Sequence, residues 1–147
     1  MDTSEQYIKM CNCPEIQGIF AARPEVYYGN WIPGDFFYRW DTKENGVYEK
    51  AADEEGYYYN GKLDNATWLP RQDQLQEMVG DLPEATERAS VELLGCFTSW
   101  CYTEDARGFR KWTPGAYQFT SMEQLWLAFC MHELHSKTWD GDKWKDV

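Results

Sequence analysis

Apolar and polar residues near the N-terminus follow the period of a helix. The apolar residues that recur at this spacing are Tyr7, Ile8, Met10 and Cys11. Residues 3–6 (TSEQ) resemble a capping box, in which Thr or Ser is followed three residues later by Gln. Pro14 fits the first turn of a helix, so a second short helix is expected to start there and to end near Phe20. The first twenty residues therefore predict two helices with a kink between them.

From Asp35 the pattern changes to the alternation with a period of two that is typical of a strand. The first strand is expected over residues 35–40, and the Asn45-Gly46 pair that follows is a strong hairpin signal. Further strands are expected over residues 47–50, 57–60 and 66–69. The middle of the chain thus predicts an antiparallel meander from Asp35 to Leu69.

One motif occurs twice in the chain. Residues 68–78 (WLPRQDQLQEM) have a shorter counterpart in residues 119–126 (FTSMEQLW). Each copy predicts a strand that turns into an amphipathic helix. Asp73 and Glu123 fall in the first turn of that helix, where negative charge interacts favourably with the helix dipole. Both helices are expected to leave a strand and to pack on the sheet.

The equivalence of the two copies also predicts core residues. Leu75 and Leu125 should both point into the core, with Trp126 beside them.

Another helix is expected to open at Pro83 and Glu84, where proline and acid are both favoured. The residues expected on its apolar stripe are Ala85, Ala89, Leu93, Cys96, Phe97, Trp100 and Cys101.

The C-terminal end of the chain predicts a helix followed by a tight turn. The helix is expected from Ser121 to about Ser136, and a turn at Asp140-Gly141 should bring Trp139 and Trp144 together. With the preceding elements this predicts a single compact α+β domain over residues 1–147. It would comprise an antiparallel sheet meander packed with three to four helices.

Composition narrows the function classes. Aromatic residues make up 17% of the 147 residues, so rings are expected both in the core and at a surface or pocket. The formal net charge of −11 repels duplex DNA and anionic membranes, although it also serves simple solubility. The cysteine count of five is odd, and the sequence shows neither a signal peptide nor a long apolar run. Free thiols in a reducing cytoplasm are therefore expected.

Candidate catalytic and metal-binding groups do not form known patterns. His132 and His135 are three positions apart, and the chain has only 2 histidines, so the metalloprotease spacing is missing and no metal is expected. Cys96 or Cys101 could pair with His132 as a nucleophile, but no local signature accompanies them. The paired acids of residues 53–55 are expected in a solvated loop. The sequence therefore favours a protein that is not an enzyme and has no cofactor.

Isolated basic residues beside aromatic rings favour ligand binding instead. Arg71 lies close to Trp68, and Arg110 lies close to Trp112, so each pair combines a phosphate- or carboxylate-binding donor with a ring that can stack on a base. These four residues are the predicted ligand-binding site. The alternative is that Arg71 pairs with an acid and that Trp68 belongs to the core.

The chain resembles a family of short uncharacterised proteins encoded by tailed phages and prophages of Gram-positive bacteria. The resemblance rests on residues 68–78, on residues 121–129 (SMEQLWLAF) and on the WDGxxW motif of residues 139–144. It covers the N-terminal helices and residues 33–35 as well. The family carries no established activity, so the resemblance implies no catalytic residues.

The resemblance implies an accessory phage protein that acts in the cytoplasm of the infected host. Such a protein is expected to work by stoichiometric binding, as a counter-defence factor that sequesters a nucleotide-like small molecule. The alternative is an acidic interaction protein that blocks a host or phage protein, for instance by mimicking nucleic acid. Direct contact with nucleic acid or a membrane is not expected, and a homo-oligomer is left open.

Overall fold

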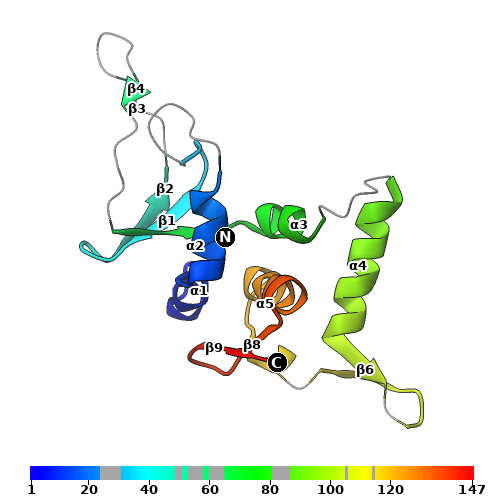
Figure 1. Ribbon diagram of the computed structural model, residues 1–147. Helices are drawn as coiled ribbons and strands as arrows, with labels where there is room; N and C mark the ends of the chain where they lie inside the picture. Colours follow the sequence, from blue (N-terminus) through cyan, green and yellow to red (C-terminus); the bar gives the residue numbers. More distant parts are fainter. Residues whose placement is uncertain are drawn as a thin grey trace. The chain divides into compact units, whose positions relative to one another are not determined.

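The computed structural model describes residues 1–23, 31–48, 51–52, 58–59, 65–80, 87–104, 106–113 and 115–147. The helices over this part of the chain are α1 (Glu5–Cys11), α2 (Pro14–Ala21), α3 (Gln72–Gly80), α4 (Glu87–Cys101), a 3-10 turn η1 (Ala116–Gln118) and α5 (Met122–His135). The strands are β1 (Phe36–Arg39), β2 (Glu44–Val47), β3 (Ala51–Ala52), β4 (Tyr58–Tyr59), β5 (Ala66–Leu69), β6 (Tyr102–Glu104), β7 (Arg110–Trp112), β8 (Lys137–Trp139) and β9 (Trp144–Asp146). Every strand pair is antiparallel, which confirms the predicted α+β class (Figure 1).

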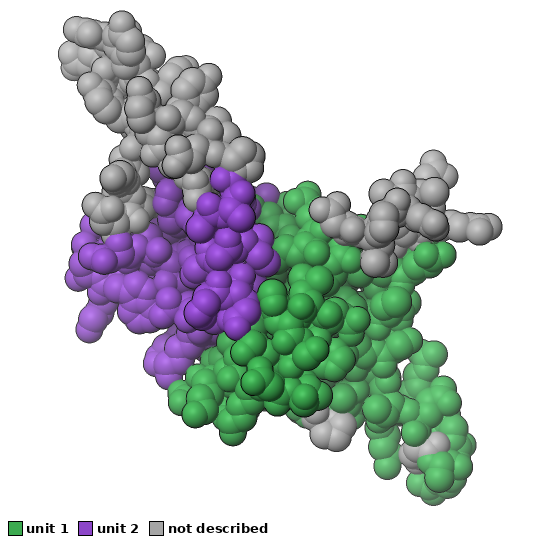
Figure 2. All heavy atoms as spheres, viewed as in Figure 1, with its two compact units in different colours: residues 1–2, 72–147 green, residues 3–71 purple. Residues whose placement is uncertain are grey.

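The chain forms two compact units (Figure 2). The N-terminal unit comprises residues 3–71, and the C-terminal unit comprises residues 1–2 and 72–147. The sequence predicted one domain over residues 1–147. The division into two compact units does not test that prediction. The predicted helix start at Pro83 and the acidic loop of residues 53–55 lie outside the described residues.

The sheet of the N-terminal unit is not the predicted meander. Its strand order is β2-β1-β5, so β1 is central, and β3 pairs with β4 in a separate two-stranded sheet. Phe36 lies opposite Val47 on one side and Leu69 on the other. The sequence order suggested that each strand pairs with the next. Instead, β5 returns to pair with β1, and it carries the most deeply buried strand residues of this sheet, Trp68 and Leu69.

The predicted turn at Asn45-Gly46 is also wrong, because both residues lie within β2. The chain turns over residues 40–43 instead, where Asp41 accepts a hydrogen bond from the Thr42 N–H and Lys43 takes the left-handed conformation with φ 58°. Gly46 lies opposite Phe37, whose ring atom Cζ would be 2.9 Å from a Cβ at position 46. The ring covers the glycine, which explains why glycine occurs inside a strand here.

Helices α1 and α2 pack on β5. Both predicted helices are confirmed, and α2 ends at Ala21, next to the expected Phe20. The N-cap of α1 is Ser4, whose hydroxyl accepts from the Tyr7 N–H, and not Thr3. The Tyr7 hydroxyl donates to the Pro70 carbonyl over 2.5 Å. The Gln17 side chain donates to the Trp68 carbonyl and accepts from its N–H, both over 3.1 Å. A buried tyrosine and a half-buried glutamine thus fix β5 and the residue after it against the helices.

In the C-terminal unit, α3 and α5 pack against each other. Leu75 is fully buried, Leu125 is 8% exposed and Trp126 is 2% exposed, so the predicted core positions are confirmed. The Trp126 ring stacks on Phe97 of α4, with centroids 3.9 Å apart and planes 6° apart. The Cys130 thiol donates to the Leu75 carbonyl over 3.2 Å. These aromatic, leucine and cysteine side chains form the core of the C-terminal unit.

The helix of the second motif copy starts where the sequence predicts. Ser121 is the N-cap of α5, and its hydroxyl accepts from the Gln124 N–H over 3.1 Å. The segment before it is not a strand, however, because Ala116–Gln118 is the 3-10 turn η1. Gly115, with φ 103°, opens this turn. Only the first copy is a strand-to-helix connection, and both helices lie in a different unit from the three-stranded sheet.

Candidate functional site

The structure places the four predicted ligand-binding residues in two separate units. Trp68 is fully buried in the N-terminal unit, where it stacks on Phe20 with centroids 5.5 Å apart and lies under the Arg23 guanidinium at 4.1 Å. Arg71 donates to the Gly34 carbonyl over 2.9 Å. Trp68 is therefore a core residue, as the alternative interpretation holds, and its ring faces are occupied by protein.

Arg110 and Trp112 lie in the C-terminal unit on a hairpin that the sequence did not predict. Strands β6 and β7 pair Tyr102 with Trp112 and Glu104 with Arg110, so these four side chains share one face. The Tyr102 and Trp112 rings are 4.4 Å apart, and Trp112 is 38% exposed. This pair remains accessible. A groove of about 240 Å³ lies beside it, lined by Arg110 and Tyr102 together with Thr98, Ser99 and Glu104, but Trp112 does not line this groove.

A pocket of about 270 Å³ lies within the C-terminal unit. Its lining comes from the end of α4, the η1 segment, α5 and the β8–β9 hairpin. The residues that line it are Trp100, Thr113, Gly115, Ala116, Gln118, Phe119, Ala128, His132, Lys137, Thr138, Trp139 and Val147. The volume is slightly below the range of about 300 to 1,000 Å³ that is usual for small-molecule sites. It therefore fits a ligand of one or two rings.

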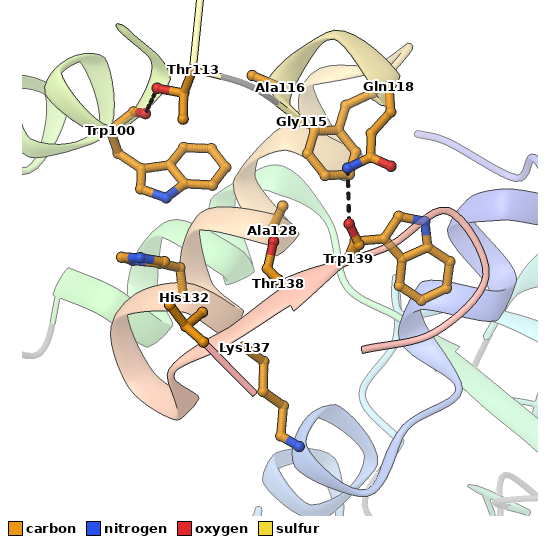
Figure 3. A pocket seen from close by; sticks show the side chains of 12 residues that line it. Trp100, Thr113, Gly115, Ala116, Gln118, Ala128, His132, Lys137, Thr138 and Trp139 are labelled. Carbon is orange, nitrogen blue, oxygen red and sulfur yellow. Dashed lines mark hydrogen bonds between the residues drawn. The ribbon is translucent and has the colours of Figure 1, made fainter. Parts of the chain in front are cut away.

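The walls of the pocket are aromatic, and its polar groups are few (Figure 3). Trp100 and His132 lie together on one side, with ring centroids 6.1 Å apart. Gln118 and Trp139 lie on the other side, where the Gln118 amide donates to the Trp139 carbonyl over 3.0 Å. Ala128 lies between these walls, and its small side chain leaves the space open.

Hydrogen bonds hold the pocket walls in position. The Thr113 hydroxyl donates to the Trp100 carbonyl over 2.7 Å, which joins the end of α4 to the residue directly after β7. Lys137 forms an ion pair with Asp146 at 3.2 Å, and its ammonium points away from His132 in Figure 3. His132 Nδ1 lies 3.0 Å from Glu133 Oε1. His132 thus contributes its imidazole ring to the wall, while the charge of Lys137 is directed toward Asp146.

The hairpin behind the pocket is fixed by Asp140. Its carboxylate accepts hydrogen bonds from the Asp142 and Lys143 N–H groups and pairs with Lys145 at 2.7 Å. The hydrogen bond from Lys145, followed by those from the two backbone N–H groups, holds the pKa of Asp140 well below its usual range. The predicted Asp140-Gly141 turn is confirmed, and it brings the Trp139 and Trp144 rings within 5.0 Å.

The cysteine environments do not favour nucleophilic catalysis. Burial raises the pKa of Cys101 to about 11 and that of Cys130 to about 12, so both thiols stay protonated at neutral pH. Cys13 is raised to about 11 for the same main reason. Cys96 is exposed. Over the described residues, no group of three or more His, Cys, Asp or Glu side chains lies close enough to hold a metal ion.

These environments predict a sharp difference in thiol reactivity. In the native protein at pH 8, a soluble thiol reagent is expected to modify Cys96 quickly and the other cysteines only on the timescale of unfolding, because they are buried. Mass spectrometry after a short labelling pulse would measure this as a single adduct. The Cys96→Ser variant should then show almost no fast labelling. Fast labelling of Cys101 or Cys130 would contradict the structure.

The chain matches no protein-family model, no curated protein and no solved structure. Among the described helices, none is both long and apolar enough to cross a membrane.

The sequence did not indicate that this pocket is a site. The sequence places Trp100 on a core stripe, and it offers His132 as a candidate metal ligand or as a catalytic partner of a cysteine. The pocket is assembled from segments around residues 100, 115 and 130 and from the C-terminal hairpin. No local motif signals such a site, since each segment contributes one or two side chains.

Proposed function

We propose that the protein acts by stoichiometric binding of a small planar molecule, such as a nucleobase or the base of a nucleotide, in the pocket of the C-terminal unit. The observation that supports this most directly is the pocket itself, with Trp100 and His132 on one wall and Gln118 and Trp139 on the other. Aromatic walls stabilise a flat ligand through its faces, and a few polar groups set its orientation.

The chemistry of the pocket favours binding over catalysis. Its described polar side chains are an imidazole, an amide, hydroxyls and a lysine that is already paired with Asp146. The raised thiol pKa values leave the buried cysteines unsuitable as nucleophiles. The resemblance to phage proteins supports the same reading, because a binding protein can neutralise a nucleotide signal in the host cytoplasm without turning it over. This makes a counter-defence role the one we propose.

Calorimetric titration tests the proposal. The intact protein would be titrated with a panel of nucleobases, nucleosides, cyclic nucleotides and ADP-ribose-type nucleotides. We expect one-to-one binding of at least one member, and Trp100→Ala should weaken that binding at least tenfold, because a stacking ring contributes about 1–3 kcal/mol. Trp100 is only half-buried, so this variant is expected to keep its fold.

The matched control is Trp112→Ala. Trp112 is exposed on the β6–β7 hairpin and does not line the pocket, so its removal should leave the affinity unchanged. If Trp112→Ala abolished binding and Trp100→Ala did not, the originally predicted pair of Arg110 and Trp112 would be the site. The absence of heat with every member of the panel would refute the proposal.

A further inference from the structure

Helix α4 has an exposed apolar face. Val91 is 72% exposed and Leu94 is 57% exposed, although both belong to a helix of 15 residues. Gly95 lies on the same side, and a Cβ at that position would meet nothing within 4 Å. The adjoining side of the helix packs into the core through Phe97 and Cys101, which are 6% and 2% exposed, and Cys101 lies at the buried C-terminal end of the helix. Positions 91, 94, 95 and 98 follow the helical spacing, so they form one continuous stripe.

Single exposed apolar residues are normal on a soluble protein, but this stripe places two large ones next to a glycine. An antiparallel pair of helices can cross closely at such a glycine, because no side chain separates the backbones. We propose that this face of α4, comprising Val91, Leu94, Gly95 and Thr98, is the contact surface of a homodimer. In it, α4 packs antiparallel on α4 of the partner subunit, with a two-fold axis near Gly95.

The charges beside the stripe favour a second copy as the occupant. Arg110 of β7 lies against α4, where it lines a groove of about 240 Å³ with Thr98 and Ser99 of the helix and with Tyr102 and Glu104 of β6. Glu92 is exposed on the helix, on the other side of Gly95 from that groove. Within the described residues, the side chains of Arg110 and Glu92 take part in no hydrogen bond or ion pair, and Glu104 is the carboxylate that faces Arg110 across the hairpin. Both charges are therefore available to an external partner.

A two-fold axis at Gly95 brings these two charges together. In an antiparallel pair, residues that lie equally far from position 95 in opposite directions face each other. Position 98 therefore faces position 92 of the partner subunit, and position 99 faces position 91. The groove at Thr98 and Ser99 then faces positions 91 and 92 of the other subunit. Arg110 accordingly meets Glu92 of the partner subunit, and symmetry makes this contact twice. Complementary charges of this kind fix register and orientation more than affinity.

The dimer is expected to be weak and reversible. One pair of crossed helices with a short hairpin buries less area than a stable permanent interface, and the net charge of −11 on each chain opposes association. Sedimentation velocity over a range of protein concentrations should show the 17.4 kDa monomer on dilution and a dimer at high concentration. A mass that stays monomeric up to the solubility limit would overturn the proposal.

Two single variants distinguish association through this face from nonspecific hydrophobic association. Leu94→Glu should abolish the dimer and leave the circular dichroism spectrum and melting temperature unchanged, since the side chain is exposed. Leu134→Glu is the matched control, because Leu134 is 46% exposed on α5 of the same unit, and it should dimerise normally. Dimerisation that survives Leu94→Glu, or that is lost equally in Leu134→Glu, would contradict the proposed surface.

A charge swap tests the antiparallel arrangement. Arg110→Glu alone and Glu92→Arg alone should each weaken the dimer at least fivefold, because each places like charges opposite one another. The double variant restores two opposite-charge contacts and should recover most of the affinity. If the double variant were no better than the single ones, the antiparallel arrangement would be wrong even if Leu94→Glu had abolished association.

Discussion

Replacing Trp68 with alanine is expected to lower the free energy of unfolding by about 3–5 kcal/mol, the usual cost of deleting a buried ring of this size. Trp68 is fully buried in the N-terminal unit. One neighbour is Phe20, whose centroid is 5.5 Å away, and the Arg23 guanidinium lies 4.1 Å from the indole ring. The deletion leaves a cavity beneath both groups and removes a cation–π contact.

Urea denaturation followed by circular dichroism measures this loss. Trp68→Phe is the control, because it keeps a ring at the position, and the Trp68 indole N–H donates no hydrogen bond to the described residues. It should cost clearly less than Trp68→Ala. If the alanine variant were as stable as the original chain, Trp68 would not be a core residue. The sequence-based prediction that its ring stacks on a ligand would then be supported again.

Replacing Leu125 with alanine is expected to cost about 2–5 kcal/mol, enough to unfold a marginally stable unit. Leu125 is 8% exposed in the first turns of α5, next to Trp126, and α5 provides most of the core of the C-terminal unit. Loss of this side chain should also loosen the stacked contact between Trp126 and Phe97.

Leu134→Ala is the matched control for this variant. It lies on the same helix but is 46% exposed, so its truncation should change the free energy of unfolding by roughly 0.5 kcal/mol or less. Thermal melts of both variants would suffice as a measurement. An unchanged melting temperature for Leu125→Ala would show that α5 does not pack through this residue.

The helices could be predicted from the sequence because their signals are local. The Ser121 hydroxyl caps α5, Pro14 opens α2, and the apolar spacing identifies Leu75 and Leu125 as core positions. Each of these signals lies within a few residues of the structure it specifies. The same locality explains the correct prediction of the Asp140-Gly141 turn.

The sheet order could not be predicted because it depends on contacts between distant segments. The Asn45-Gly46 pair has the composition of a turn, but the Phe37 ring lies over Gly46 and holds it within β2. The turn forms earlier, where the Asp41 carboxylate and the left-handed Lys43 provide its geometry. Tertiary contact therefore overrides the local turn preference.

The candidate site was harder to predict from the sequence than the fold. An arginine beside a tryptophan in the sequence suggested a stacking site at Trp68 and Arg71, yet their side chains serve the core and the Gly34 carbonyl. The pocket at Trp100 and His132 depends instead on how α4, α5 and the C-terminal hairpin converge. Proximity along the chain says little about which side chains remain accessible.

The contact between Phe37 and Gly46 has a consequence for how the sequence can diverge. A Cβ at position 46 would lie 2.9 Å from the Phe37 ring, so any larger residue there requires that ring to move or to be replaced. Natural variants of this chain should therefore substitute the two positions together. Where position 37 keeps its phenylalanine in this rotamer, position 46 should keep its glycine, and a side chain at 46 should occur with a smaller residue or a rotated ring at 37.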